Sequence, residues 1–304
     1  MAVSFKTAGA GLRCDGAMTS PDIGGAVQFL AANARVVDLR RYERLFEGGE
    51  AQPVRDAVAA YRNPDGGFGH ALEPDGRCPG SQPLAVTSAL DTLDEAGAWD
   101  ESLVLAALGW LQANEPDEGG AVFVAENIAG WPHAPWWVPE EGGRASVITT
   151  GLLAGTLHGR GVRHPWLDRA TGLMWARIGG LDAAGPYDLR AVAHFLDHVP
   201  DRDRAVKALD QLAPLITSPG VVTLDPRAPG EIHTPLDFAP RPESLARGLF
   251  EPTVIEAHLD HLARGQGDDG GWTVNWQAWS PVAAAEWRGS MTVGALARLK
   301  ANGR

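Results

Sequence analysis

A short turn sequence recurs three times along the chain and constrains its fold more than any other feature. The copies are Asp65-Gly66-Gly67-Phe68, Asp117-Glu118-Gly119-Gly120 and Asp268-Asp269-Gly270-Gly271-Trp272. Each copy follows a segment with helical periodicity and precedes a polar or aromatic loop. Recurrence of one turn at wide spacing is typical of a helical-hairpin unit that is used several times.

The composition describes a globular protein with an ample core, because 44% of its 304 residues are apolar and 21% are charged. The formal net charge is -12. We expect no nucleic-acid partner, since this chain would not neutralise phosphates. The same charge disfavours electrostatic adhesion to an anionic membrane.

The predicted domain organisation is a flexible extension over residues 1–19, rich in Gly and Ala, and a single domain over residues 20–304. We expect no transmembrane helix and no signal peptide, because no apolar run is long enough for either. Cys14 and Cys78 are the only cysteines. They favour a reducing, cytoplasmic compartment without a disulfide framework.

Apolar periodicity, together with Gly, Pro and capping residues, predicts a series of helices. Their ranges are 20–48, 53–62, 81–97, 145–159, 164–179, 186–199, 201–216, 242–250, 252–265 and 290–301, with a further helix that Asp100 caps and that extends to the second turn. Residues 221–224 and 272–276 alternate like short extended segments.

The helices fall into two kinds. The segment from Ala145 to Leu157 is apolar all round, which predicts burial on both sides, whereas the segment from Asp201 to Gln211 carries charge on one face, which predicts contact with solvent. Concentric inner and outer helices satisfy both conditions. The sequence therefore predicts an all-α fold, an α/α toroid built from helical-hairpin repeats with Gly-Gly turns.

The last turn and the helix before it resemble the Gln-Trp repeat of the squalene-cyclase and prenyltransferase superfamily, in which an outer helix ends in Gln and Gly-x-Trp follows. The segment reads Leu262-Ala263-Arg264-Gly265-Gln266-Gly267-Asp268-Asp269-Gly270-Gly271-Trp272. Weaker copies are Trp110-Leu111-Gln112 before the second turn, and the segment from Tyr61 to Phe68. With the helical periodicity, the resemblance extends over the chain from about Ser20.

The resemblance implies a barrel of about six inner and six outer helices around a funnel-shaped cavity, lined by the N-terminal ends of the inner helices. It assigns Gln266 and Trp272 to the scaffold. The chemistry departs from the family, because the chain lacks the Asp-x-Asp-Asp and Asp-Asp-x-x-Asp runs. Where the first run would fall, it reads Glu73-Pro74-Asp75. The zinc-ligand spacing of protein prenyltransferases is not reproduced around Cys78, so we expect no metal and no cofactor.

Inner helices that start near Ser81, Arg144, Pro186, Arg241 and Glu286 would bring their first turns to one cavity mouth. Three acids there are candidate proton donors, because an apolar, aromatic surrounding raises the pKa of a carboxylic acid. They are Asp237, Asp188 and Glu286, with His233 as a partner that could set the protonation of Asp237. The alternative is that each carboxylate caps or stabilises a helix start.

Aromatic residues gather in two loops, Trp131 to Trp137 and Asn275 to Trp279. Rigid aromatic walls suit an apolar ligand and stabilise developing carbocations, although the same rings could plug the fold as core. Three arginines could grip a diphosphate or carboxylate head, or pair with nearby acids. The predicted substrate-binding set is Trp131, His133, Trp136, Trp137, Tyr187, Phe238, Trp276, Trp279, Gln82, Arg144, Arg190 and Arg288.

The predicted function is that of a terpene-cyclase-like lyase or isomerase that protonates an apolar, isoprenoid small molecule in an aromatic-lined cavity. Two alternatives stay open: a non-catalytic protein that binds a hydrophobic metabolite, and a carbohydrate-active enzyme on an α/α barrel, which needs paired carboxylates around stacking tryptophans. A zinc prenyltransferase ranks last. Whether the chain forms a homo-oligomer is left open.

Overall fold

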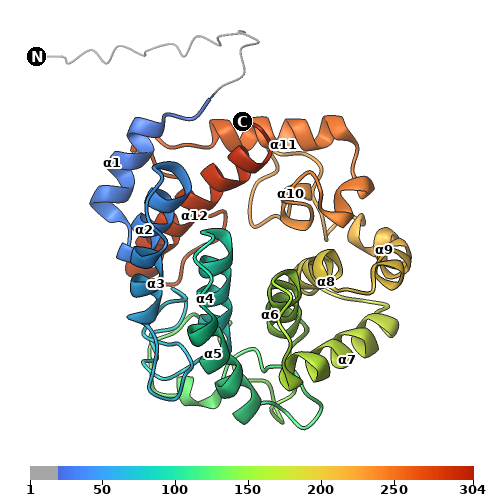
Figure 1. Ribbon diagram of the computed structural model, residues 1–304. Helices are drawn as coiled ribbons and strands as arrows, with labels where there is room; N and C mark the ends of the chain where they lie inside the picture. Colours follow the sequence, from blue (N-terminus) through green and yellow to red (C-terminus); the bar gives the residue numbers. More distant parts are fainter. Residues whose placement is uncertain (1–19) are drawn as a thin grey trace, which may run out of the picture.

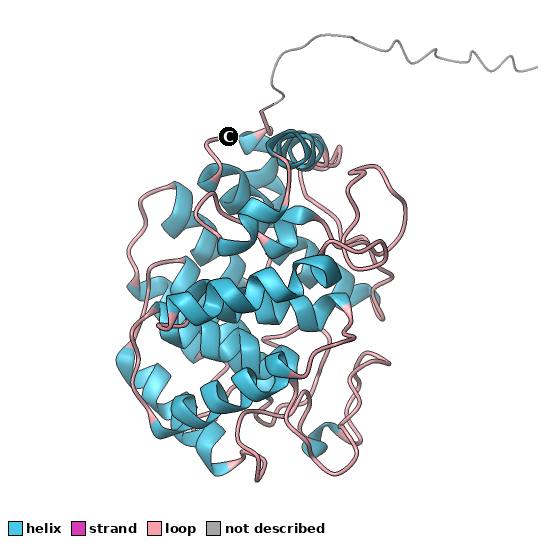
Figure 2. Cartoon of the chain, turned by 90° about the vertical axis from the view of Figure 1, so that its right-hand side faces the viewer, coloured by secondary structure: helices cyan, strands magenta, loops and turns pink. Residues whose placement is uncertain are grey.

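The structure, a computed structural model, describes residues 20–304, so the predicted extension over residues 1–19 lies outside the described part. The described chain contains twelve α-helices, two short 3-10 helices and no strand (Figure 2). The prediction of an all-α protein is confirmed. The segments 221–224 and 272–276 form loops rather than strands.

The α-helices are joined by loops of varied length (Figure 1). Their bounds are α1 (Ile23–Asn33), α2 (Val36–Phe46), α3 (Gln52–Ala59), α4 (Pro83–Glu95), α5 (Glu101–Ala113), α6 (Val147–Gly159), α7 (Pro165–Gly179), α8 (Pro186–His198), α9 (Arg202–Ile216), α10 (Pro235–Phe238), α11 (Pro252–Arg264) and α12 (Pro281–Ala301), with 3-10 helices η1 (Glu126–Ile128) and η2 (Leu245–Leu249). None of the helices in this part of the chain combines the length and apolarity needed to cross a membrane.

Local capping explains where several helices begin. The Asp100 carboxylate accepts hydrogen bonds from the backbone N–H groups of Ser102 and Leu103 at 2.9 and 3.0 Å. Asp201 accepts one from Arg204 at 3.1 Å. These bonds satisfy donors that have no partner inside the helix, so α5 and α9 begin at the predicted places.

The predicted helix over residues 20–48 is instead two helices, because Ala34 and Arg35 adopt extended backbone between α1 and α2. The guanidinium of Arg35 donates to the Leu72 carbonyl at 2.8 Å and to Asp38 at 2.9 Å. The break is therefore stabilised by a contact with a remote loop, which local periodicity does not report.

Two helices near the C-terminal end also differ from the prediction. The range 242–250 contains only the 3-10 helix η2, and the short α10 precedes it. The helix predicted over 290–301 begins earlier, at Pro281, because the Ser280 hydroxyl accepts a hydrogen bond from the Ala283 N–H at 3.1 Å and proline suits the first helical position.

The contacts between helices follow a path that returns to its start (Figure 1). Helix α12 packs on α2, and contacts then run from α2 through α3, α4, α6, α8 and α10 to α11, which packs on α12. Helices α5, α7 and α9 pack on α4, α6 and α8, and α1 packs on α12.

The three turns share one structural feature, a glycine in the left-handed region that lies against one of the helices that pack on this path, namely α5, α7 or α1. The φ angles are 95° at Gly66, 86° at Gly119 and 89° at Gly270. A Cβ atom at Gly66 would lie 2.6 Å from the Ala106 carbonyl oxygen in α5, and one at Gly270 would lie 2.1 Å from that of Gly25 in α1. Only glycine fits this combination of backbone angle and close approach.

Gln266 joins the last turn to the beginning of α1. Its Oε1 accepts a hydrogen bond from the Asp22 N–H, and its Nε2 donates to the Asp22 carbonyl, both at 2.7 Å. Nε2 also donates to the Gly270 carbonyl at 2.9 Å, and Trp272 Nε1 donates to the Leu262 carbonyl at 2.8 Å. Gln266 thus joins segments 244 positions apart, whereas Trp272 ties the last turn to the end of α11.

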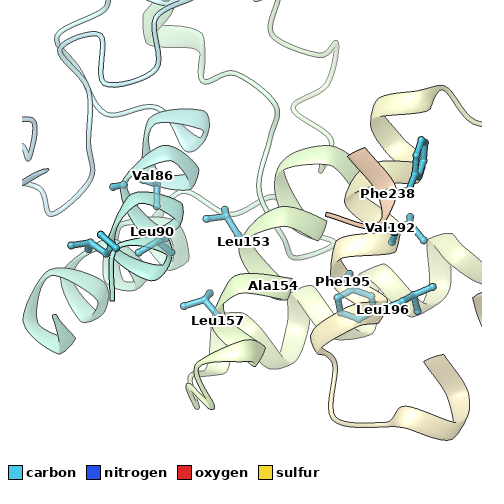
Figure 3. Packing of buried hydrophobic residues seen from close by; sticks show 14 of the residues in the cluster. Val86, Leu90, Leu153, Ala154, Leu157, Val192, Phe195, Leu196 and Phe238 are labelled. Atoms are coloured by element: carbon cyan, nitrogen blue, oxygen red, sulfur yellow. The ribbon is translucent and has the colours of Figure 1, made fainter. Parts of the chain in front are cut away.

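The core follows the closely packed helices α4, α6 and α8. Figure 3 shows Leu90, Leu153, Leu157 and Phe195 between them, and all four side chains are buried. Glycine lets α6 approach α8, since a Cβ atom at Gly155 would lie 2.9 Å from a backbone carbonyl of α8. The close packing of α6 on α8 thus depends on the glycine at position 155.

Candidate functional site

The irregular segment between the first turn and α4 is largely buried and has unusual backbone angles. His70 and Ala71 have φ angles of 54° and 63°, which are uncommon outside glycine. The Arg35 guanidinium holds the segment by donating to the Leu72 carbonyl. Strained backbone that is held by its surroundings is typical of functional sites.

This segment carries two adjacent acids, Glu73 and Asp75. The Asp75 N–H donates to Glu73 Oε2 at 2.7 Å. Each carboxylate oxygen of Asp75 accepts a hydrogen bond from an indole: Oδ1 from Trp287 Nε1 at 2.8 Å, and Oδ2 from Trp136 Nε1 at 2.9 Å. Asp75 is buried, whereas Glu73 keeps some accessible surface. The acids therefore lie where three segments meet: the segment before α4, the first aromatic loop and α12.

The groups around the two acids affect their pKa values differently. Burial raises the pKa of Glu73 well above its usual value, and the neighbouring charge of Asp75 raises it further. Burial also raises the pKa of Asp75, but the two indole N–H groups and the charge of Arg77 oppose that rise. Glu73 thus retains its proton at pH values at which an ordinary glutamic acid is ionised.

An ion pair borders the two acids. The Arg77 guanidinium binds Glu286 with two parallel hydrogen bonds, at 3.0 Å to Oε1 and 2.7 Å to Oε2. Glu286 was predicted at a helix start as a proton donor. It lies instead in the second turn of α12, as the counter-ion of Arg77.

Several of the predicted aromatic residues gather around these acids. Trp136 is 45% exposed while its N–H bonds to Asp75. Trp279 Nε1 donates to the Pro74 carbonyl at 3.4 Å, and the Trp276 ring packs edge-on against Trp287 with centroids 5.5 Å apart. The two aromatic loops therefore meet at one place, as the predicted wall of a site requires.

Other members of the predicted aromatic set have different surroundings. Trp137 is buried, and its ring covers Gly76 so closely that a Cβ atom there would lie 2.2 Å from it. Trp131 is 46% exposed, and its carbonyl oxygen lies 2.6 Å from His133 Nδ1. Phe238 is buried in the core.

The environment of Asp237 contradicts its predicted role as proton donor. Its Oδ2 accepts hydrogen bonds from the Thr234 N–H at 2.8 Å and the Thr234 hydroxyl at 2.9 Å, while Arg298 pairs with Oδ1 at 3.2 Å. Burial alone would raise the pKa of Asp237, but the charges of Arg298 and Arg190 and the Thr234 hydrogen bonds bring it to about 2. An acid that is ionised throughout the neutral range caps α10 and balances Arg298.

His233 lies near Asp237 in sequence but contacts other groups. Its ring packs edge-on against Tyr187 with centroids 4.6 Å apart, and its Nδ1 lies 3.4 Å from Arg190 Nη1. Burial and the charge of Arg190 lower the pKa of His233. The Tyr187 hydroxyl donates to Glu231 at 2.6 Å. The structure thus brings together three predicted residues, Tyr187, Arg190 and His233, in a second cluster.

The remaining predicted residues lie elsewhere. Asp188 and Arg144 both line a cavity of about 380 Å³ at the beginnings of α6 and α8. Gln82 is buried, and its Oε1 accepts a hydrogen bond from the Ala125 N–H at 2.9 Å, which ties α4 to a loop. Arg288 pairs with Asp269 of the last turn at 2.8 Å.

A chain of polar groups that sequence reasoning missed crosses α4, α6 and α8. The Thr156 hydroxyl donates to Asp91 Oδ1 at 3.0 Å and lies 3.0 Å from His194 Nε2. Burial raises the pKa of Asp91 to about 7 and lowers that of His194 to about 3. Asp91 is an exposed residue, so solvent reaches this end of the polar chain. The prediction that the segment from Ala145 to Leu157 is apolar all round does not hold at Thr156.

Sequence reasoning also left out Trp287, and it noticed Glu73 and Asp75 only as the place where a family motif is missing. The sequence signal that could have identified them is a pair of acids on either side of a proline, in a segment rich in Gly and Pro. Across residues 20–304, no three side chains of the metal-binding types are grouped so that they could hold a metal ion. No protein-family model matches the sequence, and neither does any curated protein.

Proposed function

We propose that the protein is an α/α toroid with a terpene-cyclase-like lyase or isomerase activity that protonates an apolar, isoprenoid small molecule. The returning path of helix contacts and the Gln266 junction between the last turn and α1 support the toroid. A cytoplasmic location, suggested by the two cysteines, belongs to the same proposal.

The observation that carries the proposal is Glu73, whose pKa burial raises well above its usual value, beside Asp75 and several indole rings. Glu73 Oε2 accepts the hydrogen bond from the Asp75 N–H, which leaves Oε1 to carry the proton of the neutral acid in this proposal. Transfer of that proton to an alkene carbon would leave a carboxylate on Glu73 and a carbocation on the substrate. The charges of Arg35 and Arg77 favour that carboxylate.

The aromatic rings supply the complementary stabilisation. The faces of indole rings attract positive charge, and Trp136, Trp276 and Trp287 lie around the acids. Loss of a neighbouring proton from the cation to the Glu73 carboxylate would form a new double bond and restore the acid. One proton is given and one is taken back, so the net reaction is an isomerisation that needs no further reactant.

A second candidate is a carbohydrate-active enzyme. The two carboxyl groups of Glu73 and Asp75 lie together beside a partly exposed tryptophan, Trp136, which is the combination that this class needs. Two acids with different hydrogen-bond partners can divide the acid and base roles.

The test is incubation with linear isoprenoid alcohols and diphosphates in deuterated water, and in parallel with oligosaccharides. We expect an isomerised or cyclised product that carries deuterium from solvent, and loss of turnover in Glu73→Gln. Glu50→Gln, at an exposed glutamate, is the matched control and should behave as the wild type. Product formed at an unchanged rate by Glu73→Gln would refute the acid assignment, and cleavage of oligosaccharides alone would favour the second candidate.

A further inference from the structure

Arg190 in α8 carries a charge that no acid of the described chain neutralises directly. Its Nε atom is buried and has no hydrogen-bond partner, and it forms no ion pair within residues 20–304. Its nearest polar contact is His233, with 3.4 Å between Nη1 and Nδ1. A half-buried guanidinium that forms no direct ion pair and leaves its buried Nε without an acceptor is unfavourable, so this arrangement needs a reason.

The acids nearest to Arg190 are already engaged. Asp237 pairs with Arg298 and accepts both hydrogen bonds from Thr234. Glu231 accepts the hydrogen bond of the Tyr187 hydroxyl. Neither carboxylate forms an ion pair with Arg190, although the charge of Arg190 helps to lower the pKa of Asp237.

Two neighbouring side chains, those of Tyr187 and His233, define the surroundings of the Arg190 guanidinium. The Arg190 guanidinium lies over the Tyr187 ring, with 5.6 Å between Cζ and the ring centroid. His233 is uncharged at neutral pH, because burial and Arg190 lower its pKa, and a neutral imidazole still offers one N–H. A planar guanidinium fork binds carboxylate and phosphate oxygens in pairs.

We propose that Arg190, with His233, forms a binding site for an oxyanion, the carboxylate or phosphate group of a ligand. Tyr187, Arg190 and His194 recur at helical spacing on α8, so the site lies on the same face of this helix as the polar chain to α6. The site is separate from the Glu73 and Asp75 pair, and anion binding is measured without turnover, so this inference does not depend on the proposed function.

The experiment follows the His233 ring by NMR, with its signals assigned from a His233→Gln variant, during titration with inorganic phosphate, pyrophosphate and acetate in separate arms. Binding of an anion to Arg190 should raise the pKa of His233. Arg190→Gln should raise that pKa without any anion and should weaken binding by at least about tenfold, the loss of one charge-assisted contact. A stronger response to acetate than to phosphate would identify a carboxylate ligand, and the reverse a phosphate.

The matched control is Arg204→Gln, since Arg204 also stacks on an aromatic ring, that of Trp175, but on the outer helix α9. It should bind as the wild type does. Arg190→Lys keeps the charge without the fork and serves if Arg190→Gln does not fold. No response of His233 in the wild type to any of the three anions would overturn the proposal. Glu73→Gln should bind anions normally, so failure of the acid assignment is distinguished from failure of this site.

Discussion

Trp287 Nε1 donates a hydrogen bond of 2.8 Å to Asp75 Oδ1, a contact between residues 212 positions apart. With the bond from Trp136, it leaves neither oxygen of a buried carboxylate without a donor. The geometry of the candidate acid pair therefore depends on α12, far from the acids in sequence.

Replacing Trp287 with Phe should destabilise the protein, because the ring remains but Asp75 Oδ1 loses its donor. A buried acceptor that loses its partner costs about 1–3 kcal/mol. The measurement is the free energy of unfolding in denaturant. Trp276→Phe is the control, since its ring packs on Trp287 but its N–H has no partner in the described structure. Equal losses for both variants would contradict the importance of the indole N–H.

Replacing Gly76 with Ala should also destabilise the protein. The new methyl group would lie 2.2 Å from the buried Trp137 ring, which must then shift. Overpacking of this kind costs about 1–3 kcal/mol. Gly109→Ala, within α5 and with nothing near the new methyl, should instead stabilise by about 0.5–1 kcal/mol. Denaturant unfolding of the two variants should give shifts of opposite sign, and a neutral Gly76→Ala would show that the ring moves freely.

The junction between the last turn and α1 can be tested by comparing two glycines with positive φ. Gly270→Ala adds a Cβ atom 2.1 Å from the Gly25 carbonyl oxygen, whereas Gly48→Ala meets nothing within 4 Å. Both variants bear the backbone cost of about 1–2 kcal/mol, and only the first must also separate α1 from the turn. We expect a clearly larger drop in melting temperature for Gly270→Ala. Similar drops would mean that the close approach adds nothing to stability.

The raised pKa of Asp91 predicts how stability depends on pH. The carboxyl loses its proton near pH 4 in the unfolded chain but only near pH 7 in the folded protein. Between these values the folded state binds more protons, so ionisation of Asp91 lowers stability as pH rises from about 4 to 7. Unfolding free energies of Asp91→Asn, measured across this range, should fall less steeply with pH than those of the wild type. Asp210→Asn, at an exposed position of α9, should reproduce the wild-type slope, and an unchanged slope in Asp91→Asn would refute the shift.

Predictions that depended on local chemistry agree with the structure. Asp100 and Asp201 cap helices, and Pro165 opens α7, because these signals act within one turn of the chain. The break at Arg35 was missed because a remote carbonyl, that of Leu72, stabilises it. The short α10 was missed because Thr234 and Asp237 cap only a single turn.

The residues of the candidate site also divide into those that local sequence predicts and those that depend on remote contacts. The two aromatic loops were predicted because their tryptophans are visible as clusters in the sequence. Glu73 was not chosen as the acid, because its burial arises from segments that meet only in the folded protein. Asp237 was chosen because it is the single charged group of an apolar, proline-rich segment, but the Arg298 that neutralises it lies 61 positions away.

The packing of α1 on α12 also bears on how the protein is made. During synthesis α1 leaves the ribosome long before α12, the helix against which it finally packs, has been translated. Until then its apolar side, which includes Phe29 and Leu30, has no permanent cover. The nascent chain must keep this helix from aggregating until α12 has been synthesised, and the contact between α1 and α12 is therefore a late, long-range event.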